Sequence, residues 1–234
     1  MRLSALALFF TLALPGAALA DVSAGIAAFQ AKDYQKAAAE FEQSGKDGDV
    51  WGWFYLGNMY VDGAGIGQDY KKALDAYTKA AEAGHTGAQL RLGNMYRRGF
   101  GTDKKYELAI KWLYRALEGG SAEAAMYLGD ILSTGEGDVE PSDTDAADLY
   151  EIAANEGLPH AMVKFGLMLS EGRGRAADPM HGYMWLVIAS EFVEGDLKAA
   201  LAEEQERRRT KLSPEQEAEA RKLAAEWEPW KRME

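Results

Sequence analysis

The sequence predicts an all-α solenoid, in which about five similar helix pairs stack side by side and a helical cap closes the C-terminal end. Three observations predict it: a segment that returns unchanged after 36 residues, glycines at fixed positions of that period, and apolar residues at helical spacing between them. A fixed period of this length is typical of stacked-repeat proteins, in which each unit packs only on its neighbours.

The repeated segment is Leu-Gly-Asn-Met-Tyr, which stands at 56–60 and again at 92–96, with weaker forms at 128–132 and 165–169. Its glycines are Gly57, Gly93, Gly129 and Gly166. A glycine inside a helix costs about 1 kcal/mol relative to alanine. Glycines repeated at this position therefore predict close contact between two helices, where a side chain would not fit.

Each unit is predicted to contain two helices. The first, such as residues 88–97, places Leu92, Met95 and Tyr96 on one apolar face. Two glycines separated by one residue follow it, and glycine readily adopts the left-handed conformation of helix C-caps. The second helix, such as residues 70–83, carries alanines at helical spacing and ends at a further glycine.

The period, the Leu-Gly-x-Met-Tyr core, the Gly-x-Gly loop and the Ala-Ala-Glu-Ala-Gly helix end at 80–84 resemble the Sel-one-like repeat (SLR) family. This family is related to the tetratricopeptide repeats. The resemblance covers residues 50–195 as four units, and we interpret residues 22–49 as a degenerate first unit. It implies a right-handed superhelical solenoid and adaptor roles. Some secreted members are rich in paired cysteines and linked to β-lactam binding, but this chain has no cysteine.

Residues 1–20 have the pattern of a secretory signal peptide. Arg2 precedes a mostly apolar stretch at 3–14, and Ala-Leu-Ala at 18–20 matches a cleavage site. The apolar stretch is shorter than the roughly 20 residues that a spanning helix needs. We expect cleavage after Ala20, no membrane insertion after cleavage, and a periplasmic or secreted mature protein.

Four aromatic residues lie close together at 51–55. The sequence leaves two interpretations open for Trp51 and Trp53: they cap the end of the apolar seam, or they form an exposed aromatic anchor for a partner. Aromatic side chains also stack on sugars. They are the observation behind an alternative function, that of a peptidoglycan- or polysaccharide-binding or -processing envelope protein.

The formal net charge of −11 argues against nucleic acid and anionic membranes as partners, because both need a basic surface. The charge is uneven along the chain. Residues 91–115 contain seven basic side chains, whereas residues 116–163 contain eleven acidic ones and no lysine or arginine. The sequence leaves two interpretations open for this unevenness: an ordinary solvated surface, or a surface that meets a protein partner with a basic patch.

No catalytic motif is visible in the sequence. His85, His160 and His181 are scattered, and no strand or Gly-Lys-Ser/Thr accompanies the glycine loops. The carboxylates at 138–145 do not have the spacing of an EF-hand. We therefore expect no enzymatic activity, no cofactor and no metal site.

The C-terminal residues 196–234 are predicted to form the cap, with one helix over 196–211 and another that begins at a Ser-Pro-Glu-Gln capping box at 213–216. Terminal repeats need such a cap with a polar outer face. Trp227 and Trp230 are expected to pack back onto the last unit.

The preferred functional hypothesis is an exported scaffold or adaptor of the bacterial cell envelope that binds a partner through the concave face of the solenoid. In folds of this kind the first helix of each unit lines that face. The residues off its apolar phase are Tyr55, Asn58, Arg91, Asn94, Arg98, Tyr127, Asp130 and Lys164. Asn58, Asn94 and Asp130 form one column, which is able to hydrogen-bond the backbone of an extended peptide.

Overall fold

A computed structural model of the protein describes residues 22–229, which contain twelve α-helices. In chain order these are α1 (Ser23–Gln30), α2 (Tyr34–Lys46), α3 (Val50–Asp62), α4 (Tyr70–Glu82), α5 (Thr86–Arg98), α6 (Tyr106–Glu118), α7 (Ala122–Thr134), α8 (Asp143–Asn155), α9 (Pro159–Glu171), α10 (Pro179–Ser190), α11 (Gly195–Arg209) and α12 (Pro214–Glu226). The first ten form five consecutive pairs. The predicted all-α solenoid is therefore confirmed.

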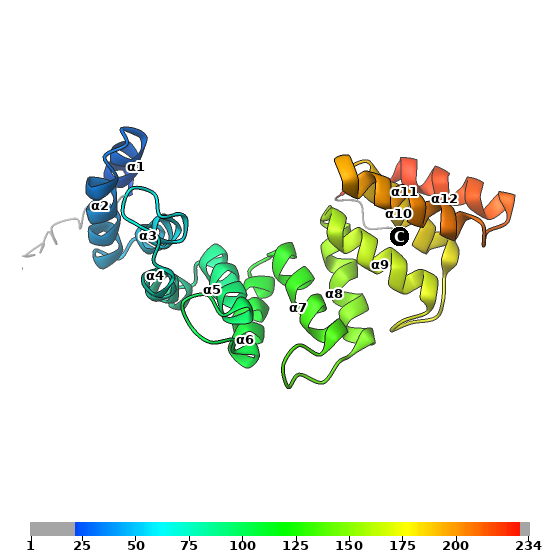
Figure 1. Ribbon diagram of the computed structural model, residues 1–234, viewed down its shortest axis with the longest axis horizontal. Helices are drawn as coiled ribbons and strands as arrows, with labels where there is room; N and C mark the ends of the chain where they lie inside the picture. The colour runs from blue at the N-terminus through cyan, green and yellow to red at the C-terminus, as the bar shows by residue number, and fades with distance from the viewer. Residues whose placement is uncertain (1–21, 230–234) are drawn as a thin grey trace, which may run out of the picture.

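The helix pairs follow one another around an arc, which Figure 1 shows as an open crescent. Each helix packs mainly on the helices before and after it in the chain, and α12 returns to pack on α10. In Figure 1, α3 and α5 lie nearer the inside of the arc than α4 and α6. We call the side formed by the odd-numbered helices α1, α3, α5 and α7 the inner face.

Buried apolar side chains form three clusters along the arc. A small cluster around Phe41 and Met59 joins α1 to α4, and a second around Tyr77 and Leu92 joins α4 to α6. A large cluster continues from α5 to α12 and contains Trp185. Many of the buried residues are alanines, whose small side chains allow the helices to approach closely.

The helix glycines lie where the two helices of a unit touch. A Cβ atom on Gly57 would lie 2.6 Å from the ring of Tyr77, and one on Gly129 would lie 2.8 Å from the ring of Tyr150. Real Cβ atoms do not approach other atoms so closely. The predicted close contact between helices is therefore confirmed.

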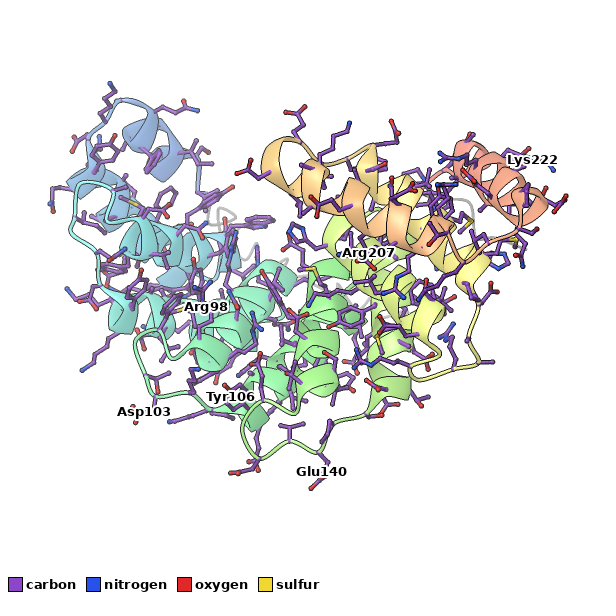
Figure 2. The ribbon with its side chains drawn as sticks, turned by 45° about the vertical axis from the view of Figure 1, so that its right-hand side comes forward. Arg98, Asp103, Tyr106, Glu140, Arg207 and Lys222 are labelled. Atoms are coloured by element: carbon purple, nitrogen blue, oxygen red, sulfur yellow. The ribbon has the colours of Figure 1, made fainter. Side chains whose placement is uncertain are left out.

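The two glycines of each Gly-x-Gly loop have different roles. The first, such as Gly99 with φ 76°, is the left-handed C-cap that the sequence predicts. The second, such as Gly101 with φ 73°, faces the preceding unit, where a Cβ would lie 2.3 Å from the backbone oxygen of Tyr70. Gly174 likewise faces the backbone oxygen of Asp143, whereas Gly65 and Gly137 face the side chains of Tyr34 and Tyr106. Figure 2 shows two of the loops, which carry Asp103 and Glu140, at the outer edge of the arc.

The last helices cover α10, which is buried on almost all sides. The Trp185 ring in α10 is 1% exposed and lies 5.8 Å, between ring centroids, from Trp227. The predicted packing of Trp227 on the last unit is thus confirmed, as is the capping box of Ser213 and Gln216. Trp230 lies outside the described residues.

Candidate functional site

The inner face contains two adjoining hollows. The apolar hollow, between α1 and α3, has a volume of about 470 Å³, and its walls include Phe29 and Tyr55. The polar hollow, between α3, α4 and α5, has a volume of about 370 Å³ and is lined partly by Arg91. Asn58 and Asp62 line both hollows, so the two meet along α3.

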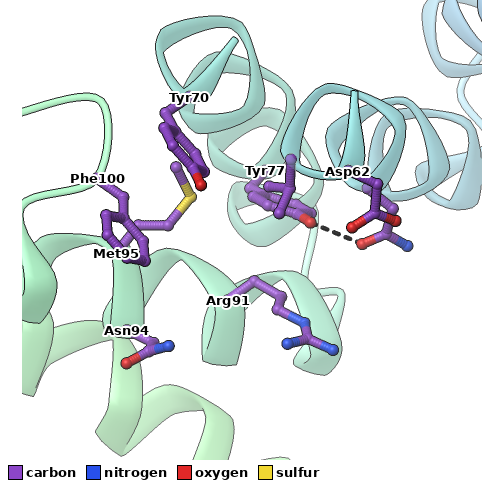
Figure 3. Close-up of a pocket in the computed structure, with 9 residues that line it drawn as sticks. Asp62, Tyr70, Tyr77, Arg91, Asn94, Met95 and Phe100 are labelled. Carbon is purple, nitrogen blue, oxygen red and sulfur yellow. Dashed lines mark hydrogen bonds between the residues drawn. The ribbon is translucent and has the colours of Figure 1, made fainter. Parts of the chain in front are cut away.

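The polar hollow has a polar end and an aromatic end. Figure 3 shows Asp62 and Arg91 near the hydroxyl group of Tyr77, while Tyr70 and Phe100 lie at the other end. These two aromatic rings stack with centroids 5.0 Å apart. The hollow therefore offers charged and hydrogen-bonding groups beside an apolar wall.

Two members of the predicted polar column bind tyrosines of their own unit. The Tyr77 hydroxyl donates to Asn58 Oδ1 at 2.6 Å, and the Tyr150 hydroxyl donates to Asp130 Oδ1 at 2.9 Å. Burial raises the pKa of both hydroxyl groups, which keeps them protonated. Each of these two oxygens therefore already accepts a hydrogen bond within the protein. The sequence prediction did not include these hydrogen bonds.

Asn94, the middle member of the column, differs from the other two. The equivalent residue of α6 is Leu113, which has no hydroxyl group to donate. Asn94 Oδ1 is buried and has no hydrogen-bond partner within residues 22–229. A buried acceptor without a donor costs roughly 1–3 kcal/mol. Because solvent does not reach this oxygen, water does not remove that cost.

Arg97, which is not among the predicted site residues, contacts two of them, Tyr127 and Asp130. Its guanidinium lies 5.0 Å from the Tyr127 ring centroid, and Nη1 lies 3.7 Å from Asp130 Oδ2. A third predicted residue, Lys164, pairs with the other oxygen of this carboxylate, with Nζ 2.6 Å from Asp130 Oδ1. The sequence signal was an arginine adjacent to the predicted Arg98, but only the stacking of α5 on α7 shows which of the two arginines meets a carboxylate.

The acidic segment 116–163 is partly neutralised in space. Cations from neighbouring units form ion pairs with five of its carboxylates, namely Asp130, Glu136, Asp143, Asp148 and Glu151. Its other six acidic side chains are exposed. The prediction of a partner with a basic patch therefore depends on those six.

The two tryptophans singled out by the sequence have different environments. Lys79 Nζ lies 4.3 Å from the ring centre of Trp53, and the other neighbours of this ring include Gly45 of α2. Because α1 and α2 precede it, Trp53 does not close the end of the seam, and that interpretation is wrong. Trp51 is 47% exposed and is the one of the pair that presents an open ring surface.

His85 links these aromatic residues to the start of α5. Its imidazole stacks on Phe54 with centroids 4.3 Å apart, and Nδ1 accepts a hydrogen bond from the Ala88 backbone N–H at 3.1 Å. Burial lowers the pKa of His85 from its ordinary value of 6.5. The imidazole is therefore neutral in the folded protein and serves as the N-cap of α5.

We expect acid to destabilise the protein partly through His85. Since its pKa is lower in the folded state, the neutral imidazole contributes stability that is fully present above pH 6.5 and decreases as the pH falls towards the folded-state pKa. Denaturant unfolding from about pH 8 to about pH 5 should show a larger loss for the wild type than for His85→Asn, which keeps a capping oxygen. Equal losses in both proteins would contradict this role.

Within the described part of the chain, no group of three or more histidine, aspartate and glutamate residues is arranged to hold a metal ion. No helix of residues 22–229 is both long enough and apolar enough to cross a membrane.

Comparisons with known proteins agree with this architecture. The Sel1 repeat family matches residues 54–85, 86–121, 122–158 and 159–191. A solved Sel1 repeat protein from Oxalobacter formigenes is 28% identical, with a TM-score of 0.69, over 78% of this chain and 75% of that one. A protective antigen of uropathogenic Escherichia coli with an SLR fold is 24% identical, with a TM-score of 0.52, over 90% of this chain and 55% of that one. This second likeness shows the fold alone.

No curated protein matches the chain. Sel1 repeat proteins generally act as scaffolds for protein–protein interaction, and their fold is typically non-catalytic. The repeat period, the helix pairs and the four matched segments all agree. The chain belongs to the Sel1 repeat family.

Proposed function

We propose that the protein is an exported scaffold or adaptor of the bacterial cell envelope, which binds a segment of a partner protein on its inner face. Membership of the Sel1 repeat family supports the scaffold role. The signal-like residues 1–20, which lie outside the described residues, support export.

The observation that carries the proposal is the position of the two hollows. Both lie on the inner face, and they meet at Asn58 and Asp62 without an intervening helix. A continuous surface that crosses α1, α3 and α5 suits an elongated chain segment better than a compact small molecule. The side chain of Asn94 adds a polar group to the wall of the polar hollow.

Site-specific photo-crosslinking in cells tests the proposal. A photoreactive phenylalanine analogue is placed at Phe29 or at Tyr127 on the inner face, and at Tyr114 on α6 as the control. Phe29 and Tyr114 are 40% and 44% exposed, so both are accessible. We expect the two inner positions to crosslink to the same protein and Tyr114 to give no such product.

Fractionation of the same cells tests export. The crosslinked product should be in the envelope or periplasmic fraction, with a subunit mass that corresponds to cleavage after Ala20. Crosslinking from Tyr114 alone would contradict the inner-face assignment. Retention of the full-length chain in the cytoplasm would contradict export but leave the binding face intact.

A further inference from the structure

Two unpaired arginines lie at the polar hollow. Arg91 lines the hollow and is exposed, and the guanidinium of Arg98 lies 4.7 Å from the ring centre of Phe100, which also lines the hollow. Neither forms an ion pair with a carboxylate in the part of the chain that the structure describes. Of the eight other described arginines, Arg115 also forms no such pair, and the remaining seven do: Arg97, Arg173, Arg175, Arg207, Arg208, Arg209 and Arg221.

This contrast matters because the chain has a large excess of acidic residues. With 37 aspartates and glutamates against 26 lysines and arginines, carboxylate partners are plentiful. Arginines that remain unpaired beside a hollow are therefore available to an external anion. A guanidinium binds a carboxylate through two parallel hydrogen bonds, and this pairing is both strong and directional.

The remaining polar groups restrict where an anion can lie. Asp62 is exposed between the two hollows and would repel a carboxylate placed near α3. A bound carboxylate is thus favoured on the α5 side, next to Arg91. Asn94 lines the hollow on that side as well, and its side-chain amide, which has both an acceptor and donors, is compatible with a bound carboxylate.

The apolar hollow offers a second kind of contact to the same partner segment. Its walls include the side chains of Ile26, Phe29 and Met59, and its volume of about 470 Å³ exceeds that of any single side chain. Phe29 is 40% exposed although it is a large apolar residue. A leucine or aromatic side chain inserted here would cover apolar surface that the protein leaves open to water.

We propose that the two hollows together bind an extended, acidic segment of a partner protein. A large apolar side chain of the segment occupies the apolar hollow, and a carboxylate further along the segment pairs with Arg91. This inference rests on the proposed binding role of the inner face and adds the chemistry of the partner. It differs from the basic partner predicted from the acidic unit, which would meet other residues.

Selection of randomised peptides on the purified mature protein tests the inference. We expect the enriched peptides to share an acidic residue close to a leucine or aromatic residue. Fluorescence anisotropy then measures the affinity of the most enriched peptide for each variant. Arg91→Glu and Phe29→Ser should each weaken binding at least about tenfold, because each removes one of the two main contacts.

Arg115→Glu is the matched control, since Arg115 is also exposed and unpaired within residues 22–229 but lines neither hollow. It should leave the affinity unchanged, and circular dichroism should show that all three variants are folded. If the enriched peptides were basic and bound Phe29→Ser more weakly than the wild type, the inference of an acidic segment would be wrong, but the binding role of the inner face would be supported. If the enriched peptides bound all variants with the same affinity, both the acidic segment and the binding role of the inner face would be contradicted. If the selection enriched nothing, the acidic segment would be contradicted, and the photo-crosslinking experiment would decide the binding role.

Discussion

Replacing Trp185 with alanine should lower the free energy of unfolding by about 3–5 kcal/mol, the range for a buried tryptophan truncated in a core. The side chain is 1% exposed and packs edge-on against Phe165 and Trp227, in each case with ring centroids 5.8 Å apart. Its removal would leave a cavity between the last helix pair and the cap. Denaturant unfolding followed by circular dichroism gives the loss.

Trp51→Ala is the control, because Trp51 is 47% exposed and its main contacts are with neighbouring rings. Such contacts contribute roughly 0.5–1.5 kcal/mol. Since each unit packs only on its neighbours, Trp185→Ala should also increase hydrogen exchange mainly in α9 to α12. A loss no larger than that of Trp51→Ala would contradict the role of Trp185 in holding the cap.

Gly101→Ala should destabilise the protein by about 2–5 kcal/mol, because it combines two costs. The residue has φ 73°, which is unfavourable for alanine, and the new Cβ would lie 2.3 Å from the backbone oxygen of Tyr70. A backbone atom cannot rotate away as a side chain can. The loop and the preceding unit must therefore separate.

Gly120→Ala isolates the first of these costs. Gly120 has φ 88°, but a Cβ there would have no neighbour within 4 Å. We expect a loss of about 1–2 kcal/mol for this variant, from the left-handed backbone alone. If thermal and denaturant unfolding gave equal losses for the two substitutions, the contact between units would not depend on Gly101.

The helix pairs, their ends and their apolar faces could be predicted from the sequence because each depends on local signals. The bounds predicted for 70–83 and 88–97 differ from α4 and α5 only at the helix ends. Gly57 and its equivalents indicated close packing because a helix interior otherwise disfavours glycine. Because these local signals recur in every unit, the prediction for one unit is supported by the others.

Contacts between units could not be predicted in the same way, because they depend on how far one unit is shifted against the next. The sequence shows Gly101 as part of a loop, and only the stacking brings it against Tyr70. It likewise shows Asp130 as a polar residue of the inner face. It does not show that Tyr150, Arg97 and Lys164 all converge on this carboxylate.

The division of the buried side chains into two small N-terminal clusters and one large C-terminal cluster has a mechanical consequence. When the arc is pulled at its two ends, every interface between neighbours carries the same tension, because contacts run mainly along the chain. The two smaller clusters bury less apolar area, so their helices should separate at a lower force than those of the large cluster. A partner segment seated across α1, α3 and α5 would span these clusters, so its binding should raise the force at which the N-terminal half extends.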